Sequence, residues 1–233
     1  MLNIYIGYDP RESVAFHTLS HSLLRRASTP ISLSPLVQGQ LKGLYRRGRG
    51  PTESTEFSLT RFLVPTLSGY RGWSLYMDCD MLCRTDIAAL ARETERHPDK
   101  ALLVCKHDYQ PRGERKFLDQ VQTRYARKNW SSLMLFNNER CRALSADYVN
   151  SASGLELHRF AWVDDGLIGE LPLEWNWLVT EYPYNADAKI VHFTLGGPYF
   201  DEYRDCDYSA EWFAEFSAAT GRRFRSESST HRR

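Results

Sequence analysis

Two aspartates separated by one residue directly follow an apolar segment of the sequence. Asp78 and Asp80 come after residues 73–77, Trp-Ser-Leu-Tyr-Met, whose composition is typical of a buried β-strand. Alternate side chains of an extended chain share a face, so both carboxylates point to one side and Cys79 to the other. Two such close carboxylates repel each other unless a cation lies between them, and Mg²⁺ and Mn²⁺ favour oxygen ligands. The pattern predicts either a divalent metal site or an acidic turn whose aspartates accept backbone N–H groups.

The elements expected around this pair alternate between strand and helix. Strands are predicted at residues 1–7, 31–37, 73–77, 101–105, 132–136 and 189–193, and helices at 10–26, 57–63 and 86–95, with a helix or turn at 164–171. Asp9-Pro10 provides an N-cap and a first helical residue, and Pro65 is expected to bend or end the second helix. This alternation predicts an α/β fold with a mostly parallel central sheet flanked by helices. Ligands of such sheets bind beyond the carboxyl ends of the strands, where Asp78 and Asp80 lie.

The composition is that of an ordinary globular chain. Of its 233 residues, 42% are hydrophobic, and 30 basic residues balance 29 acidic ones. The apolar content argues against disorder across the chain, and the balanced charge excludes nucleic acid as the expected partner because such binding needs a basic surface.

The cysteines and the N-terminus bear on the compartment. The cysteines are odd in number and form no C-x-x-C pair, which favours a reducing environment: Cys79, Cys83, Cys105, Cys141 and Cys206. No segment approaches the roughly 20 apolar residues of a transmembrane helix, and the N-terminus lacks the basic start of a signal peptide. We expect a cytoplasmic protein without a transmembrane segment.

Four segments, in order, resemble the motifs of family 8 glycosyltransferases. They are Ile-Tyr-Ile-Gly-Tyr-Asp at 4–9, the Arg-bearing segment 55–65, Leu-Tyr-Met-Asp-Cys-Asp-Met-Leu at 75–82 and Ile-Val-His-Phe-Thr-Leu-Gly-Gly-Pro at 190–198. The chain is similar to a divergent, bacterial-type member. The resemblance implies retaining transfer from a nucleotide sugar, in particular a UDP-sugar, by a Rossmann-like GT-A fold. It also implies a single such domain over residues 1–220, followed by an Arg/Ser-rich tail at 221–233 that we expect to be disordered.

The resemblance implies a metal shell of Asp78, Asp80 and His192. These residues would bind Mn²⁺ or Mg²⁺, which neutralises the roughly two negative charges of the departing diphosphate. Taken alone, His192 has the alternative of a structural histidine. Gly197, next to Gly196, would let the backbone approach the phosphates closely.

The resemblance assigns donor contacts to Tyr8, Asp9 and Arg61. Tyr8 and Asp9 would contact the base or ribose, although Asp9 is equally explained as a helix cap. Arg61 would reach toward the donor near the acidic pair. Its alternative, a solvated helix arginine, is weakened by the apolar residues 62–64 beside it.

Asp164 and Asp165, followed by residues 166–168 and later by Trp175-Asn176, resemble the Asp-Gln pair that the family places near the transferred sugar. The Gln position is Asp165 here, and a carboxylate beside the anomeric carbon could stabilise an oxocarbenium ion or act as nucleophile. The other route is same-face attack with the leaving phosphate accepting the proton. A helix N-cap with a neighbouring surface charge is the structural alternative. Asn129 would bind sugar hydroxyls, and Trp130 could stack on a sugar face.

The chain departs from the family where a Lys usually follows the His motif. Pro198-Tyr199-Phe200 stands there instead, and Lys128 is the most plausible replacement cation, with a solvated lysine as the alternative. The sequence does not identify the acceptor, which could be a glycan, a lipid-linked sugar or a protein. The basic residues within the loop 38–55, namely Lys42, Arg46, Arg47 and Arg49, could meet an anionic acceptor or a membrane surface, or form a mobile solvated loop.

Two other functions fit parts of the pattern. A non-catalytic nucleotide-sugar or carbohydrate-binding domain could keep the cleft without turnover, and the missing Lys favours it. A D-x-D after an apolar strand also marks haloacid-dehalogenase-like phosphatases, whose first Asp is a nucleophile. Those enzymes generally carry Thr or Val where this chain has Leu82.

Overall fold

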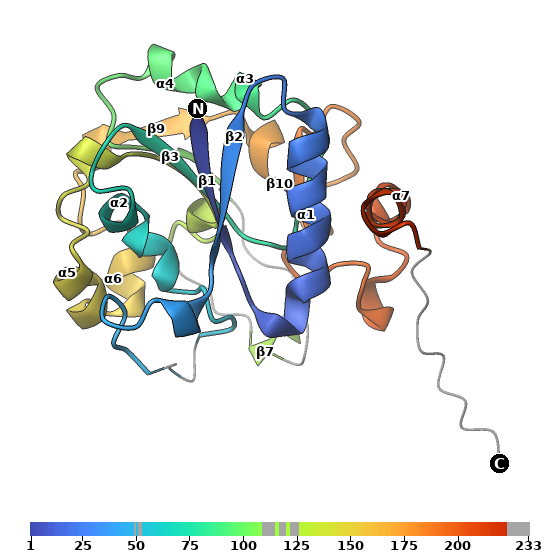
Figure 1. Ribbon diagram of the computed structural model, residues 1–233, viewed down its shortest axis with the longest axis horizontal. Coiled ribbons are helices and arrows are strands. Elements are labelled where there is room, and N and C mark those ends of the chain that lie inside the picture. Colours follow the sequence, from blue (N-terminus) through green and yellow to red (C-terminus); the bar gives the residue numbers. More distant parts are fainter. Residues whose placement is uncertain (49, 51–52, 109–114, 117–119, 122–125, 223–233) are drawn as a thin grey trace.

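The protein is built around a six-stranded sheet. The computed structural model describes residues 1–48, 50, 53–108, 115–116, 120–121 and 126–222 (Figure 1). The sheet has the order β2-β1-β3-β8-β5-β9. Its strands are β1 (Leu2–Gly7), β2 (Ile31–Leu36), β3 (Trp73–Met77), β5 (Leu102–Cys105), β8 (Leu133–Asn137) and β9 (Ile168–Leu171). Only β8 runs antiparallel to its neighbours in this sheet, so the predicted α/β fold with a mostly parallel sheet is confirmed.

Central strands of the sheet are buried on both faces. All four residues of β5 and residues 133–136 of β8 are fully buried, and Leu103 pairs with Leu135, which in turn pairs with Leu75 of β3. Near-continuous apolar runs are expected where helices and loops cover a sheet on both sides. This burial fixes the end of β3, from which Asp78 and Asp80 emerge.

A second, three-stranded sheet joins two segments far apart in the sequence. It consists of β10 (Trp177–Leu178), β11 (Ile190–His192) and β4 (Met81–Cys83), in that spatial order. Strand β11 runs antiparallel to β4, with His192 opposite Met81. Because β4 begins directly after Asp80, this register brings His192 next to the acidic pair. Separately, β6 (Arg115–Lys116) pairs antiparallel with β7 (Gln120–Val121).

The two longest helices of the described chain, α1 (Ser13–Arg26) and α7 (Ser209–Thr220), lie side by side (Figure 1). Buried Glu215 of α7 binds Arg26 and His21 of α1 at 2.8 and 2.5 Å. The shorter helices are α2 (Val64–Leu67), α3 (Ala88–Ala91), α4 (Glu93–Arg96), α5 (Ala146–Ser151) and α6 (Gly154–His158). Short 3₁₀ helices span Pro10–Glu12, Gln38–Gln40, Thr60–Leu63, Trp130–Ser132, Asn138–Arg140, Asp165–Leu167, Leu173–Asn176 and Asp201–Tyr203. None of the described helices has the length and hydropathy needed to span a bilayer.

Three local predictions are corrected by the structure. The helix predicted at 57–63 is a 3₁₀ helix over Thr60–Leu63 only, and Pro65 lies after its end, in the first turn of α2, where a missing N–H costs no hydrogen bond. The helix predicted at 86–95 is two separate short helices, α3 and α4. The segment 164–171 contains the expected turn but continues into β9, which pairs with β5 at the edge of the sheet.

The basic loop is anchored where the structure describes it. Arg46 binds Asp147 of α5 at 2.6 Å, and Arg47 donates to the carbonyl of Val149 at 2.9 Å. These two arginines therefore bind the protein itself, while Lys42 and Arg46 are exposed to solvent, as the predicted solvated loop requires. Arg49 and residues 223–233 of the expected tail lie outside the described residues.

Candidate metal and donor site

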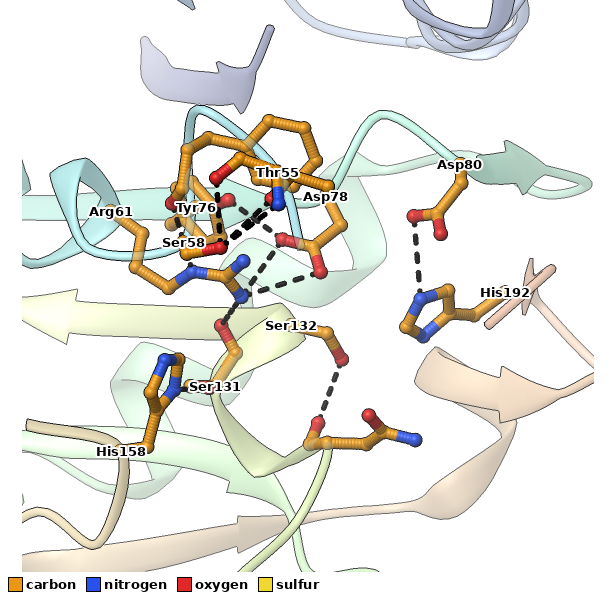
Figure 2. Close-up of polar contacts among 12 residues, drawn as sticks. Thr55, Ser58, Arg61, Tyr76, Asp78, Asp80, Ser131, Ser132, His158 and His192 are labelled. Atoms are coloured by element: carbon orange, nitrogen blue, oxygen red, sulfur yellow. Dashed lines mark hydrogen bonds and ion pairs between the residues drawn. The ribbon is translucent and has the colours of Figure 1, made fainter. Parts of the chain in front are cut away.

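The fold brings together the three residues expected to form a metal shell. Asp78 and Asp80 leave the end of β3, and His192 ends β11 (Figure 2). One ligand atom from each lies within 4.8 Å of the others, and all three residues are buried. The Phe193 N–H donates to the carbonyl of Asp80 at 2.9 Å, and this hydrogen bond holds the segment after β11 beside the segment after β3. His192 Nε2 lies 3.3 Å from Asp80 Oδ1.

The chemistry of this group fits a divalent cation. Within the described part of the chain, Asp80 Oδ1 is buried and accepts no hydrogen bond, and such an unsatisfied oxygen is costly. Two carboxylates with one imidazole form a ligand set suited to Mn²⁺ and acceptable to Mg²⁺. The three residues could therefore hold a metal ion.

Arg61 is buried beside Asp78 rather than solvated. Its Nη1 lies 2.9 Å from Asp78 Oδ1 and donates to the Ser131 carbonyl at 2.8 Å, while its Nε donates to the Phe57 carbonyl at 3.2 Å. The guanidinium also lies over the ring of Tyr76, 5.1 Å from its centroid. These contacts leave Arg61 oriented toward Asp78 (Figure 2).

Burial dominates the electrostatics of Asp78. Loss of solvent raises the pKa of Asp78, the Arg61 guanidinium lowers it, and neighbouring Asp80 raises it again, with a net increase. The Tyr76 hydroxyl donates to Asp78 Oδ1 at 2.7 Å, and burial raises the pKa of Tyr76 well above its ordinary value, so it remains a donor. The chain thus supplies one cation, Arg61, at Asp78, and a bound metal ion would balance the charge at Asp80.

Asp9 acts as the predicted cap, in a 3₁₀ turn before α1. Its carboxylate accepts the backbone N–H of Arg11 at 3.0 Å and that of Glu56 at 3.1 Å. It also accepts hydrogen bonds from Nε and Nη2 of the Arg11 side chain, at 2.9 and 2.6 Å. Burial raises the pKa of Asp9, but these hydrogen bonds lower it by more. Tyr8 beside it is half-buried and packs edge-to-face on Phe16.

Asp164 and Asp165 are exposed at the start of the turn before β9. Asp164 occupies the N-cap position, but its side chain makes no capping hydrogen bond. Asp165 Oδ1 lies 2.6 Å from Arg127 Nη2, and the Arg127 guanidinium lies 5.5 Å from the Trp130 ring centroid. Asp164 therefore occupies the N-cap position of the structural alternative but does not make the hydrogen bond of an N-cap.

Lys128 is buried between two residues with left-handed backbone. Arg127 has φ 65° and Asn129 φ 63°, a conformation that is strained for non-glycine residues and concentrates at functional sites. The Asn129 amide lies 3.3 Å from the hydroxyl of Thr194, two residues beyond His192. The solvated-lysine alternative for Lys128 is therefore wrong.

Gly197 leaves room for an aromatic ring of the protein itself. A Cβ there would lie 2.2 Å from Cε1 of Tyr199, so no side chain fits. The Tyr199 hydroxyl donates to buried Glu12 at 2.6 Å. Packing of Tyr199 therefore accounts for this glycine independently of any phosphate.

One residue of the site, Tyr76, escaped the sequence analysis. Tyr76 had a usable signal, because it precedes Asp78 by two residues on a strand and so shares its face. Asn176 belongs to the resemblance near the transferred sugar, but its contact with His192, Oδ1 to Nδ1 at 3.1 Å, was not predicted because it depends on pairing between β10 and β11.

Solved glycosyltransferases share this fold. The chain superposes on the apo structure of the bifunctional glycosyltransferase WbbM with a TM-score of 0.64 and 12% identity, covering 93% of this chain and 49% of that one. The galactosyltransferase LgtC, in complex with donor and acceptor sugar analogues, gives 0.61 and 12%, covering 97% and 98%. Mouse xyloside xylosyltransferase 1 gives 0.53 and 12%, covering 84% and 99%. The chain spans about half the length of WbbM, and at these identities the similarity shows a GT-A fold.

A close sequence relative exists among curated proteins. No family model matches the chain. Protein CDI of Arabidopsis thaliana is 44% identical over 222 residues, which cover 91% of this chain and 85% of that protein. The chain therefore belongs to the family of Protein CDI.

Proposed function

We propose that this chain is a retaining, metal-dependent glycosyltransferase of family 8 that moves a sugar from a nucleotide sugar, in particular a UDP-sugar, to an acceptor. The observation that carries the proposal is the buried Asp78-Asp80-His192 group at the carboxyl edge of a GT-A sheet. This is the edge at which open α/β sheets bind ligands. The acceptor is a glycan, a lipid-linked sugar or a protein.

Asp78, Asp80 and His192 hold the metal in this proposal. A bound Mn²⁺ or Mg²⁺ supplies positive charge to the diphosphate as it departs. Arg61, which contacts Asp78 at 2.9 Å, keeps that carboxylate in place. A water-excluded site of this kind makes each fixed charge more effective than it is in solvent.

The other predicted residues bind the two ends of the donor. Tyr8 and Asp9 contact the base or ribose, and a donor hydroxyl at Asp9 replaces one of the four hydrogen bonds that fill its lone-pair sites. Gly197 and Lys128 lie along the diphosphate.

In this proposal Asn129, Asp164 and Asp165 contact the transferred sugar. Asn129 binds hydroxyls, while the aspartates stabilise charge at the anomeric carbon. Retention requires either a carboxylate nucleophile or attack from the face of the leaving phosphate. Retained transfer in Asp165→Asn would exclude Asp165 as the nucleophile, because only a carboxylate can act in that way.

The direct test is hydrolysis of a panel of UDP-sugars with and without metal. The amount of UDP released measures the hydrolysis. We expect slow hydrolysis of at least one sugar with Mn²⁺ and none after chelation. Asp80→Ala should abolish it, whereas the matched control Asp147→Ala, at an 88% exposed side chain, should retain it. Hydrolysis that is unaffected by both chelation and Asp80→Ala would contradict the proposal, as would rapid phosphate release from a phosphomonoester.

A non-catalytic nucleotide-sugar-binding domain is the second candidate. It is favoured by Tyr199, which packs over Gly197 in the segment where the family usually carries a Lys. Metal-dependent donor binding without hydrolysis or transfer to any acceptor would support this function over the first.

A further inference from the structure

Asn176 contacts His192 on the side of the ring away from Asp80. It is fully buried at the end of the 3₁₀ turn Leu173–Asn176, immediately before β10 pairs with β11. Its Oδ1 lies 3.1 Å from His192 Nδ1, while His192 Nε2 lies 3.3 Å from Asp80 Oδ1. The two ring nitrogens thus face two different groups.

The surrounding hydrogen bonds determine which way the Asn176 amide points. Its Nδ2 lies 2.8 Å from Ser132 Oγ, 3.1 Å from His107 Nε2 and 3.4 Å from the Asn129 carbonyl. Ser132 donates its own hydroxyl proton to the Asn129 carbonyl at 2.7 Å, so its oxygen accepts from Asn176. The reversed amide would direct an acceptor at the Asn129 carbonyl, so the amide oxygen faces His192.

The neighbouring histidine is compatible with the same orientation. His107 Nδ1 lies 2.9 Å from the Tyr182 hydroxyl, which can accept from an Nδ1–H, and in that tautomer Nε2 accepts from Asn176. An imidazole with one accepting nitrogen is neutral. Burial lowers the pKa of His107 to about 3, in agreement with that neutral form.

An amide oxygen can only accept, and this fixes the proton of His192. Nδ1 carries the hydrogen, and in the neutral ring Nε2 then presents a lone pair. Nε2 lies 3.3 Å from Asp80 Oδ1, a buried oxygen that accepts no hydrogen bond in the part of the chain described. Two acceptors at this distance repel each other unless a cation lies between them.

We propose that Asn176 is a positioning residue that holds His192 in the Nδ1–H tautomer, with Nε2 free to bind the metal. Ser132 and His107 hold the amide in turn. Outer-shell partners of metal-bound histidines act in this way, and their loss weakens metal binding about 10–100-fold. The metal part of the inference rests on the proposed function, whereas the tautomer of His192 does not.

The first measurement is the affinity of the full chain for Mn²⁺ alone, from the electron paramagnetic resonance signal of the free ion. Asn176→Ala should weaken binding about 10–100-fold. Asn138→Ala is the matched control: Asn138 is also fully buried and donates to Ser74, at the opposite end of β3 from Asp78. Asn138→Ala should leave the affinity nearly unchanged, and an equal loss in both variants, or no loss in Asn176→Ala, would overturn the inference.

The second measurement is the ¹⁵N NMR signal of His192 in the metal-free chain. We expect a protonated Nδ1 and an unprotonated Nε2, and a mixture of tautomers in Asn176→Ala. A wild-type His192 protonated at Nε2 would overturn the inference. A chain that fails to bind Mn²⁺ but shows the Nδ1–H tautomer would refute the metal-dependent function and leave the inference standing.

A second pair of variants covers the case in which Asn176→Ala does not fold. His107→Gln keeps an acceptor for the Asn176 amide, whereas His107→Leu removes it. We expect His107→Gln to retain the tautomer of His192 and His107→Leu to lose it. The same tautomer in both variants would contradict the part assigned to His107.

Discussion

The protein carries two pairs of acidic residues whose environments are opposite. In the first, Asp78 and Asp80 have side chains that are each 12% exposed, and Arg61, Tyr76 and His192 surround them. In the second, the Asp165 side chain is 78% exposed and pairs with Arg127. The first pair depends on the protein for its stabilisation, while the second is largely stabilised by water.

This difference separates what the fold arranges in advance from what a ligand would have to arrange. Burial and, to a smaller extent, neighbouring Asp80 raise the pKa of Asp78 despite the contact with Arg61, so the folded chain disfavours the charged carboxylate and a bound cation would relieve that cost. Exposed carboxylates cost little, and an ion pair between them and a surface cation contributes little. The Asp78-Asp80-His192 group, which we propose as the metal site, is therefore preorganised, whereas Asp165, which we propose to act at the sugar, would depend on its ligand.

The largest expected effect comes from removing the buried cation. Arg61→Ala leaves Asp78 buried without its ion pair, and we expect the free energy of unfolding to fall by about 3–5 kcal/mol. Urea denaturation measures this loss. Arg46→Ala removes a cation of the same type, whose side chain is 56% exposed and pairs with Asp147. We expect it to lower the free energy of unfolding by less than about 1 kcal/mol. Equal losses in the two variants would remove the energetic distinction between buried and exposed pairs.

The next effect concerns the metal. Asp80→Ala removes one of three ligands, and we expect Mn²⁺ affinity to fall more than about 100-fold, or about 2.7 kcal/mol. Isothermal titration of the metal-free chain with MnCl₂ measures it. Unchanged affinity in Asp80→Ala would show that the buried group is not the metal site.

Local patterns predicted the acidic pair and the strand that presents it. The apolar run at 73–77 coincides with β3, and alternation along the chain placed Asp78 and Asp80 on one face. The resemblance added His192, which lies within 4.8 Å of both. These features are encoded in short segments, which is why the sequence alone indicated them.

Contacts between distant segments were beyond local patterns. The antiparallel register of β11 and β4, which places His192 opposite Met81, has no signature in either segment. The contact of Asn176 with His192 depends on the pairing of β10 with β11, and β9 was missed because its edge position is set by β5. Pairing across the sequence therefore determines the part of the site that the sequence analysis omitted.

The third effect is a pH dependence of stability. The pKa of His107 is about 3 in the folded chain and about 6.5 when unfolded, so between these values the unfolded state binds more protons. Stability therefore falls as the pH falls, and from pH 7 to pH 5 this group accounts for about 2 kcal/mol.

His107→Gln should lose correspondingly less stability over this interval, as measured by urea denaturation at both pH values. His17→Gln, at an exposed histidine, is the control and should keep the wild-type pH dependence. A His107→Gln chain with the full wild-type loss would refute the assignment of this pH dependence to the buried imidazole.

The smallest effect is expected at the exposed pair. Asp165→Asn removes the charge that Arg127 contacts at 2.6 Å, but both groups remain accessible to water, so the free energy of unfolding should change by less than about 1 kcal/mol. Mn²⁺ affinity should also stay near the wild-type value, because the residue is not among the three clustered ligands. Thermal denaturation with and without Mn²⁺ measures both quantities on one sample. A loss as large as that of Arg61→Ala would mean that Asp165 is held by the fold as firmly as Asp78, and the contrast between the two acidic pairs would then be wrong.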